Sequence, residues 1–334
     1  MTQNFISSLY HQATDLSSRW KSILDSLTDV PFKPDDQPTS FVKWFNTEKV
    51  GSVQIHGTYQ HQPAILKIQG VKPDISEIEH TQQFSKQTRS TQIRAPQILY
   101  NQPWDETQQA EIIIWEKTTA PSLHLSKPIK PNELSNYLQV YQDFQTNAIT
   151  NPWIPKPDSI SFQKKFNQIT SVTKSTKDLD QNLIQTALDI LKSNITPEDL
   201  VFQHGHFEPS RIRQISENQY IIISHLFWGW KNPFYDLVFG YHWHMLGMES
   251  IPNLTQQILD TERTHWLDSF YNLNQVSTTP QAEKWLTLAR LERALFAYAA
   301  DSTMLDKSKP SYELIKQDCY NQLHQLIDQH DSSK

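Results

Sequence analysis

The chain has 334 residues and a formal net charge of −6, and 37% of its residues are hydrophobic and 20% charged. Its length provides a core for one or two domains, and the composition is that of a globular protein, which excludes a disordered chain. Because no long run of lysine and arginine is present, we expect neither nucleic acid nor a membrane surface as a partner.

Cysteine content and the lengths of the apolar runs indicate the cellular compartment. The single cysteine, Cys319, cannot form an internal disulfide, and its neighbours have no redox or metal-binding spacing. The N-terminus lacks a basic start followed by an apolar run, and no segment approaches the roughly eighteen apolar residues of a membrane-spanning helix. We therefore expect a cytoplasmic protein.

The first part of the chain predicts a helix followed by a small β-rich lobe. Apolar residues recur at nearly helical spacing over residues 4–27, and a proline-rich linker follows at 31–38. Strand-like runs separated by polar turns then occur at 41–45, 50–56 and 64–69. A helix at 74–88 and strands at 93–100 and 110–115 complete the pattern. The order is three antiparallel strands, one helix and two further strands.

The rest of the chain predicts a mostly helical lobe. Candidate helices lie at residues 131–148, 159–171, 180–194, 233–248, 252–274, 280–304 and 311–330. A polar turn at 216–218 predicts a hairpin over residues 211–223. This hairpin interrupts the helical pattern close to the most informative part of the sequence.

The most informative part of the sequence consists of three short segments. Residues 204–212 read H-G-H-F-E-P-S-R-I, residues 223–224 read I-S, and residues 229–237 read G-W-K-N-P-F-Y-D-L. In order and spacing they resemble the motifs H-G-D-x-H-x-x-N, I-D-(W/F) and G-W-x-x-P-x-Y-D-L-(A/V) of aminoglycoside phosphotransferases, which share the protein-kinase-like fold with choline and fructosamine kinases. Short motifs are hypotheses that need their structural context.

The resemblance implies an α+β protein with the two-lobed protein-kinase-like fold. Its small N-lobe would hold five antiparallel strands, and its larger C-lobe would be helical. We place an N-terminal helix and linker at 1–38, the N-lobe at 39–117 and the C-lobe at 118–334. The remnant of the catalytic loop would occupy 204–212 and 223–237.

The residues that carry chemistry in that family are replaced here. His206 stands where the family has the Asp that accepts the proton of the substrate hydroxyl. Arg211 stands in place of an Asn, and Ser224 in place of an Asp, that hold metal ions under the nucleotide phosphates. Phosphoryl transfer is mostly positioning plus neutralisation of charge by metal ions. A cation and a neutral hydroxyl at the two metal positions therefore predict that the reaction is lost.

The N-lobe carries further positions that the resemblance makes candidates for nucleotide contact. Lys67, in A-I-L-K-I, occupies the place of the strand-three lysine that contacts nucleotide phosphates, unless it simply faces solvent. Its helical partner would be Glu79 or Glu77, and only one of them can face the strand because residues two apart on a helix point about 200° apart. Glu116 and Lys117 would form the hinge whose backbone meets an adenine ring.

Two further features give weaker evidence about ligands. They are the expected phosphate-covering loop and the histidines near the motifs. Residues 48–52, where such a loop would lie, contain one glycine and no G-x-G. His204, His206 and His225, with Glu208, could form a zinc site, since histidine is the commonest metal ligand. Their spacing is no known zinc signature and Arg211 brings a positive charge nearby, so we predict no metal. Two further histidines, at 242 and 244, are too close together on a helix to share one metal ion.

The sequence thus predicts a pseudoenzyme of the aminoglycoside phosphotransferase-like family that binds a small ligand or a protein partner without phosphoryl transfer and without a cofactor. The alternative is an active phosphotransferase that uses ATP and magnesium on a small hydroxyl-bearing substrate, with His206 as base. A structural partner in a complex is a third, weaker reading. The residues expected at a nucleotide site under the alternative are Lys67, Glu79, Glu116, Lys117, Arg211 and Ser224.

Overall fold

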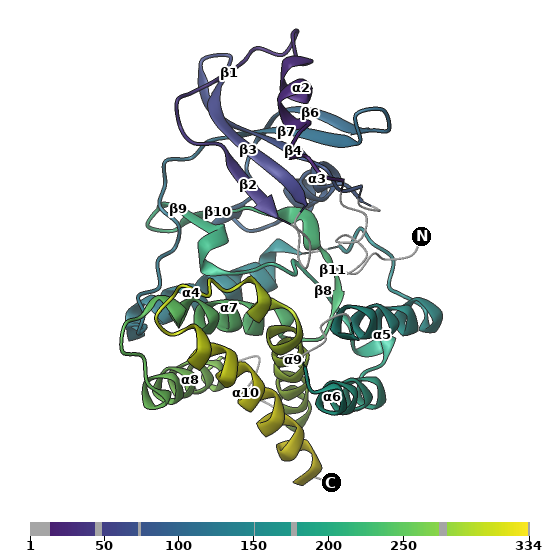
Figure 1. Ribbon diagram of the computed structural model, residues 1–334, viewed down its shortest axis with the longest axis vertical. Helices are drawn as coiled ribbons and strands as arrows, with labels where there is room; N and C mark the ends of the chain where they lie inside the picture. Colours follow the sequence, from purple (N-terminus) through teal and green to yellow (C-terminus); the bar gives the residue numbers. More distant parts are fainter. Residues whose placement is uncertain are drawn as a thin grey trace. The chain divides into compact units, whose positions relative to one another are not determined.

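The computed structural model describes residues 14–43, 49–72, 75–149, 151–174, 179–273 and 279–332 (Figure 1). The chain divides into two compact units. The N-terminal unit consists of Met1–Pro121 with Arg213–Leu226, and the helical unit of Ser122–Ile212 with Phe227–Lys334. The prediction placed residues 1–38 apart from the N-lobe and residues 213–226 in the C-lobe, whereas both stretches are grouped with the N-terminal unit.

The N-terminal unit is built on a six-stranded antiparallel sheet. Its order is β1-β3-β4-β7-β6, with β2 paired to β3. The strands are β1 (Phe32–Pro34), β2 (Ser40–Lys43), β3 (Val50–Tyr59), β4 (Gln62–Gln69), β6 (Ile98–Asp105) and β7 (Ala110–Glu116). The predicted strands at 50–56, 64–69 and 110–115 are confirmed. Residues 44–45 of the predicted 41–45 strand and residue 48 of the predicted phosphate loop lie outside the described residues.

Two strands of this unit differ from prediction. The proline-rich stretch was expected to be a linker, but Phe32–Pro34 pairs with β3 at the edge of the sheet, where a proline that ends an edge strand interrupts no ladder. The predicted strand at 93–100 is broken at Pro96, which has no N–H to donate. Its first part, β5 (Ile93–Arg94), pairs in parallel with β10 (Gln219–Ile222) in a separate three-stranded sheet that β9 (Ile212–Ser216) completes.

Among its described residues, the N-terminal unit also contains two α-helices and the predicted hairpin. The short helix α2 (Trp20–Asp25) buries Ile23, and the preceding Leu16 is fully buried in the same core. The part of the predicted helix before residue 14 lies outside the described residues. Helix α3 (Glu77–Gln87) begins after Ser76, whose hydroxyl caps it; residue 74, where the prediction began, is also outside the described residues. The hairpin of β9 and β10 confirms the one predicted at 211–223.

The helical unit contains the seven helices predicted from the sequence, with ends shifted by a few residues; residue 274, where the predicted 252–274 helix ended, lies outside the described residues. The helices are α4 (Pro131–Asp143), α5 (Ser159–Lys174), α6 (Gln181–Asn194), α7 (Tyr235–Leu246), α8 (Gln256–Tyr271), α9 (Pro280–Ala299) and α10 (Tyr312–Ser332). The predicted 131–148 helix changes at Phe144–Ala148 into a π-helical turn. The only strands of this unit within the described residues are β8 (Val201–Gln203) and β11 (Gly229–Lys231), which pair with each other.

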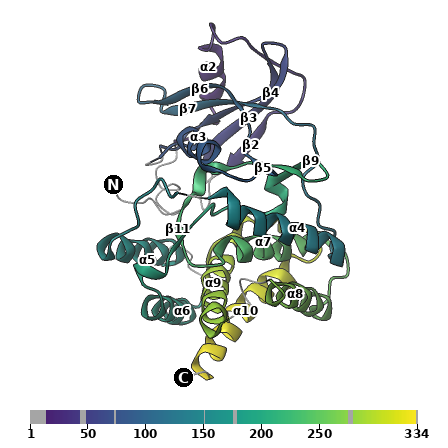
Figure 2. The ribbon, with the colours of Figure 1, turned by 180° about the vertical axis from the view of Figure 1, so that it is seen from behind.

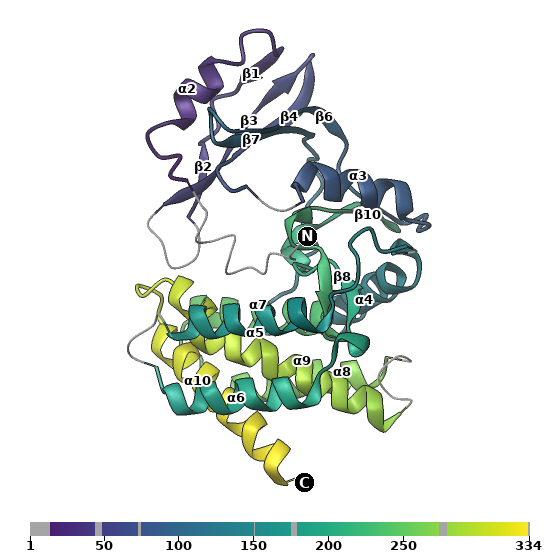
Figure 3. The ribbon, with the colours of Figure 1, turned by 90° about the vertical axis from the view of Figure 1, so that its right-hand side faces the viewer.

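Helix α9 is central to this unit. It packs against α6, α7 and α10 (Figure 2), and 12 of its 20 residues are buried, which makes it a core helix and not a surface one. Helices α5 and α6 lie side by side (Figure 3). None of the helices in the described part of the chain combines the length and the apolar character of a membrane-spanning segment.

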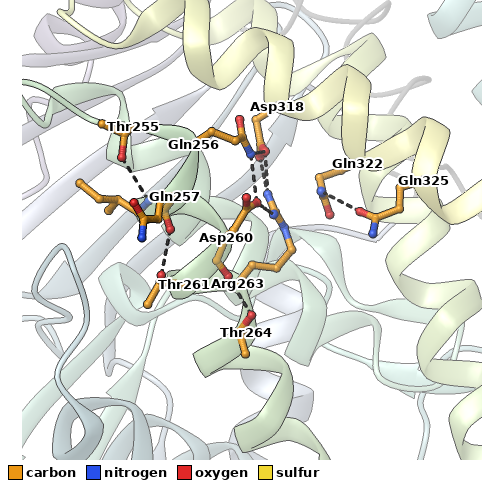
Figure 4. Close-up of polar contacts among 11 residues, drawn as sticks. Thr255, Gln256, Gln257, Asp260, Thr261, Arg263, Thr264, Asp318, Gln322 and Gln325 are labelled. Carbon is orange, nitrogen blue, oxygen red and sulfur yellow. Dashed lines mark hydrogen bonds and ion pairs between the residues drawn. The ribbon is translucent and has the colours of Figure 1, made fainter.

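Buried charges connect α8 to α10. The guanidinium group of Arg263 donates to both carboxylate oxygens of Asp318, at 2.6 and 2.8 Å, and to Asp260 at 2.6 Å (Figure 4). Gln256 donates to the same Asp318 carboxylate at 3.1 Å. Because Arg263 and Asp318 are both about nine-tenths buried, this two-point contact fixes the register of the two helices.

Candidate functional site

The loop that carries the first motif lies in the helical unit and is held by a buried carboxylate. The backbone N–H groups of His204 and Gly205 donate to the two oxygens of Asp236, at 2.8 and 2.7 Å. The N–H of Asp236 in turn donates to Gln203 on β8, at 3.0 Å. Burial raises the pKa of Asp236 to about 6, and the N–H donors and Lys231 oppose that rise. The first turn of α7 therefore sets the backbone of the motif loop.

Gly205 is required by the path of this loop. Its φ of +79° lies in the left-handed region, which glycine adopts without the steric cost of a side chain. A Cβ atom there would lie 2.3 Å from Cε of Lys231 and 2.4 Å from the backbone oxygen of Phe227. The glycine that the motif shares with the family thus has a structural role here.

His206 occupies an aromatic environment. Its ring makes edge contacts with Phe227 and Phe239, with centroid separations of 5.0 and 5.1 Å, and its side chain is 16% exposed. A carboxylate oxygen of Glu208 lies 4.0 Å from its Nε2, which is longer than a hydrogen bond. The ring is therefore packed mainly by hydrocarbon, with one acid close by.

Glu208 and Arg211 form an ion pair. Nε of Arg211 donates to Glu208 at 2.9 Å, and the hydroxyl of Ser210 donates to the same oxygen at 2.8 Å. The sequence alone predicts Arg211 to be a cation at a metal position and makes Glu208 a possible zinc ligand. The structure shows instead that Glu208, 11% exposed, balances Arg211. Their spacing of three residues was the signal available in the sequence.

In the N-terminal unit, Lys67 faces the helix and not solvent. Its ammonium group on β4 donates to the carboxylate of Glu77 on α3, and the two side chains are 13% and 3% exposed. Glu79, the other candidate and the residue expected at a nucleotide site, is exposed, and its backbone N–H is capped by Ser76. Of the two partners that the sequence left open, Lys67 therefore pairs with Glu77, because the face of α3 that carries Glu77 turns toward the strand.

A second acid beside this pair was missed by the sequence analysis. Glu111 on β7 lies opposite Gln69 of β4, and both side chains are fully buried. Neither oxygen of its carboxyl group makes a hydrogen bond of normal geometry within the described residues, although Ser76 and the backbone of Glu77 lie close enough to lower its pKa. Burial, followed by the negative charge of Glu77, raises the pKa of Glu111 to about 7, although Lys67 opposes the rise. The available signal was an acid inside the apolar run A-E-I-I-I-W at 110–115.

Ser224 and His225 follow β10 and belong to the N-terminal unit. Ser224 has a φ of +72°, which is uncommon for a residue with a side chain. His225 is fully buried, stacks on Phe84 of α3 at 5.1 Å, and its Nε2 lies 2.7 Å from the backbone oxygen of Ile222. Burial lowers its pKa to about 4, so the ring is neutral at pH 7 and acts as a packing group.

The predicted hinge residues make contacts within the N-terminal unit. The N–H of Glu116 donates to Gln97 and the N–H of Lys117 to Pro63, each at 2.9 Å. The Glu116 carboxylate pairs with Arg94. The role of Glu116 and Lys117 in nucleotide binding stays a prediction.

The described residues contain no cluster of three or more His, Cys, Asp or Glu side chains arranged to hold a metal ion. His244 instead pairs with the buried Glu262 at 2.5 Å. Burial, together with the positive charges of Arg293, Arg290 and Arg263, lowers the pKa of His242. Both histidines of α7 therefore belong to the interior of the helical unit.

Comparison with known proteins was made by sequence and by structure. No protein-family model and no curated protein matches the chain by sequence. By structure, the aminoglycoside phosphotransferase APH(4)-Ia, solved as a thermostable mutant with ADP and hygromycin B, aligns over 93% of this chain and 98% of its own, with 11% identity and a TM-score of 0.52. The amicoumacin kinase hAmiN, solved with AMP-PNP, Ca²⁺ and Ami, aligns over 93% and 94%, with 11% identity and a TM-score of 0.55.

These similarities establish the fold. The chain has the α+β protein-kinase-like fold of phosphotransferases of the aminoglycoside type, as its motifs predict. At 11% identity the likeness concerns architecture alone, and function must be argued from the residues of the site.

Proposed function

We propose that this protein is a kinase-like pseudoenzyme that binds a small ligand or a protein partner without transferring phosphate. The observation that carries the proposal is the set of side chains at the three chemical positions of the motifs, His206, Arg211 and Ser224. They supply an imidazole, a guanidinium and a hydroxyl where the family has two carboxylates and an amide.

The surroundings of these residues support the proposal. Magnesium is bound by carboxylate, carbonyl and water oxygens, and the acid in the loop, Glu208, is bonded to Arg211 and Ser210. A guanidinium group held at a metal position repels a divalent cation. The His206 ring is packed against two phenylalanine rings and supplies no oxygen ligand for a metal ion.

What is kept is the framework. Asp236 still holds the motif loop by two backbone N–H groups, and Lys67 still pairs with an acid of α3. A retained scaffold with replaced chemical groups is consistent with a protein that was kept for binding.

A second candidate function is an active phosphotransferase with His206 as base. The 4.0 Å separation of Glu208 from Nε2 of His206 favours it, because a carboxylate that moves slightly closer would orient the ring and stabilise its protonated form. The Lys67–Glu77 pair also suits a nucleotide-binding lobe. APH(4)-Ia and hAmiN were solved with ADP and AMP-PNP respectively.

The test is an assay for phosphorylated product with Mg-ATP and hydroxyl-bearing acceptors such as hygromycin B, kanamycin and choline. We expect the native protein to form no more product than a His206→Ala variant. A general base contributes about 10²–10⁴-fold to a rate, so an active enzyme would show a clear difference. Product that disappears in His206→Ala would overturn the pseudoenzyme proposal in favour of the second candidate.

A gain-of-function experiment tests whether the three replaced groups prevent nucleotide binding. The triple variant His206→Asp, Arg211→Asn, Ser224→Asp should bind Mg-ATP measurably by isothermal titration, because it adds oxygen ligands and releases Glu208 from Arg211. The single variant Ser224→Asp, which keeps the Arg211 cation, should not bind. If neither variant binds while circular dichroism shows both folded, the replaced groups are not what prevents nucleotide binding.

A further inference from the structure

One lysine and two acids meet on the face of the N-terminal sheet that is turned toward α3. In the antiparallel pairing of β4 with β7, Lys67 lies opposite Ile113 and Gln69 lies opposite Glu111. Residues two apart on a strand share a face, so Lys67 and Glu111 are diagonal neighbours, about 7–8 Å apart and within reach of long side chains. The Lys67 ammonium also meets the Glu77 carboxylate of α3. Two acids therefore compete for one ammonium group.

This competition takes place in the interior of the N-terminal unit. Glu111 is fully buried and Glu77 is 3% exposed. The Glu111 carboxyl lies close to the hydroxyl of Ser76 and the N–H of Glu77, at the start of α3. With both acids ionised, this small buried volume would hold two negative charges and one positive charge. Because burial disfavours an excess charge, the packed arrangement favours a proton on one of the two acids.

Lys67 is the one permanent cation among the described groups that act on the Glu111 carboxyl. Burial lowers the pKa of His225, at the end of β10, to about 4, so its ring is neutral. His80 is buried one turn further along α3. On β6, Asp105 pairs with the residue before Glu111 and so belongs to the other face of the sheet. A negative charge on Glu111 must therefore be balanced by Lys67 or by water.

We propose that α3 is a pH-sensitive latch: when the Glu111 carboxyl ionises, it draws Lys67 away from Glu77, and the first turn of α3 leaves the sheet. Water then reaches both acids, which removes the penalty of burying the second negative charge. Between the ordinary pKa of the Glu111 carboxyl, 4.5, and its raised pKa of about 7, the closed form binds one proton more than the open form. Rising pH therefore favours the open latch throughout this range and has no further effect above it. The latch needs no bound ligand, so it goes beyond the function proposed above.

The experiment follows amide hydrogen exchange of the full-length protein by mass spectrometry from pH 5 to pH 8, with each rate divided by the intrinsic rate at that pH. We expect the opening constant of peptides from α3 to rise about tenfold per pH unit up to about pH 7 and then to level off, as the release of one proton on opening implies. Because the latch opens locally, low concentrations of urea should barely change this constant. Peptides from β3 should exchange more slowly and with the steep urea dependence of global unfolding.

Three variants separate the trigger from the rest of the helix. In Glu111→Gln, which has no carboxyl group to ionise, the opening constant of α3 should keep its pH 5 value over the whole range. Glu79→Gln is the matched control, because it removes an exposed acid from the same helix, and it should keep the native pH dependence. Glu77→Gln removes the competitor for Lys67, so α3 should open more readily at pH 5 and respond less to pH.

Three results would overturn the latch. The opening constant of α3 in the native protein could stay the same from pH 5 to pH 8. Glu111→Gln could keep the native pH dependence, which would assign the effect to another group such as His80. Peptides from α3 and β3 could exchange through one opening with the same urea dependence, which would leave no separate movement of the helix. The measurements on the native protein need no variant, so they test the proposal even if Glu111→Gln fails to fold.

Discussion

Glu111→Gln should change how the stability of the N-terminal unit depends on pH. The folded protein keeps the Glu111 carboxyl fully buried and raises its pKa from 4.5 to about 7, chiefly through burial. A carboxyl whose pKa is higher in the folded than in the unfolded state binds more protons when folded, so stability falls as pH rises. The loss begins near pH 4.5, the ordinary value, and is complete above about pH 7.

The size of the effect follows from the two pKa values. A difference between 4.5 and about 7, at about 1.4 kcal/mol per pKa unit, corresponds to about 3 kcal/mol of unfolding free energy lost at pH 8. Glutamine has nearly the same shape and does not ionise. The variant should therefore melt at a higher temperature than the native protein at pH 8, by about 6–12 °C, and at nearly the same temperature at pH 5.

The assay is a series of thermal unfolding curves from pH 5 to pH 8.5 on the native protein and the variant. His225 titrates in the opposite direction, because burial lowers its pKa to about 4, but its contribution is common to both proteins and cancels in the difference. Glu116→Gln is the control on the same strand. Burial opposes its ionisation, but hydrogen bonds with Arg94 and Gln97 lower its pKa overall, so this variant should gain nothing at pH 8. Parallel curves for the native protein and Glu111→Gln across the whole range would refute the reasoning.

Two further predictions concern buried ion pairs. Arg263→Met should lower the free energy of unfolding by about 3–5 kcal/mol, because it leaves the buried Asp318 carboxylate without its charged partner. Urea denaturation measures this, and a loss below about 1 kcal/mol would contradict it. Glu77→Gln should lower the melting temperature because Lys67 loses its charged partner. Glu79→Gln, at an exposed position of the same helix, should change the free energy of unfolding by no more than about 0.5 kcal/mol. Equal effects of the two changes would contradict the assigned pairing.

Local pattern was enough to predict most of the secondary structure. The seven helices of the helical unit follow from apolar residues at helical spacing, and the strands β3, β4 and β7 follow from apolar runs bounded by turn residues. The turn at 216–218 correctly predicts the hairpin. The motif segments predict the fold because their glycine and aspartate have backbone roles, as Gly205 and Asp236 show.

Pairings between distant segments were decided by the tertiary structure alone. The prolines around Phe32–Pro34 indicate a linker, yet the free edge of β3 recruits this segment as a strand. The parallel pairing of Ile93–Arg94 with β10 joins segments more than a hundred residues apart, and no local pattern encodes such a pairing.

At the candidate site, too, some properties follow from the sequence and others only from the tertiary structure. The identities of His206, Arg211 and Ser224 are read directly from the sequence, and the proposal that phosphoryl transfer is lost rests on them. The surroundings of the charged groups cannot be read from the sequence. Whether Glu77 or Glu79 meets Lys67 depends on how α3 is rotated against the sheet. The raised pKa of Glu111 depends first on the burial of its carboxyl group. Charge interactions and burial arise only when elements pack together, so they are properties of the folded chain.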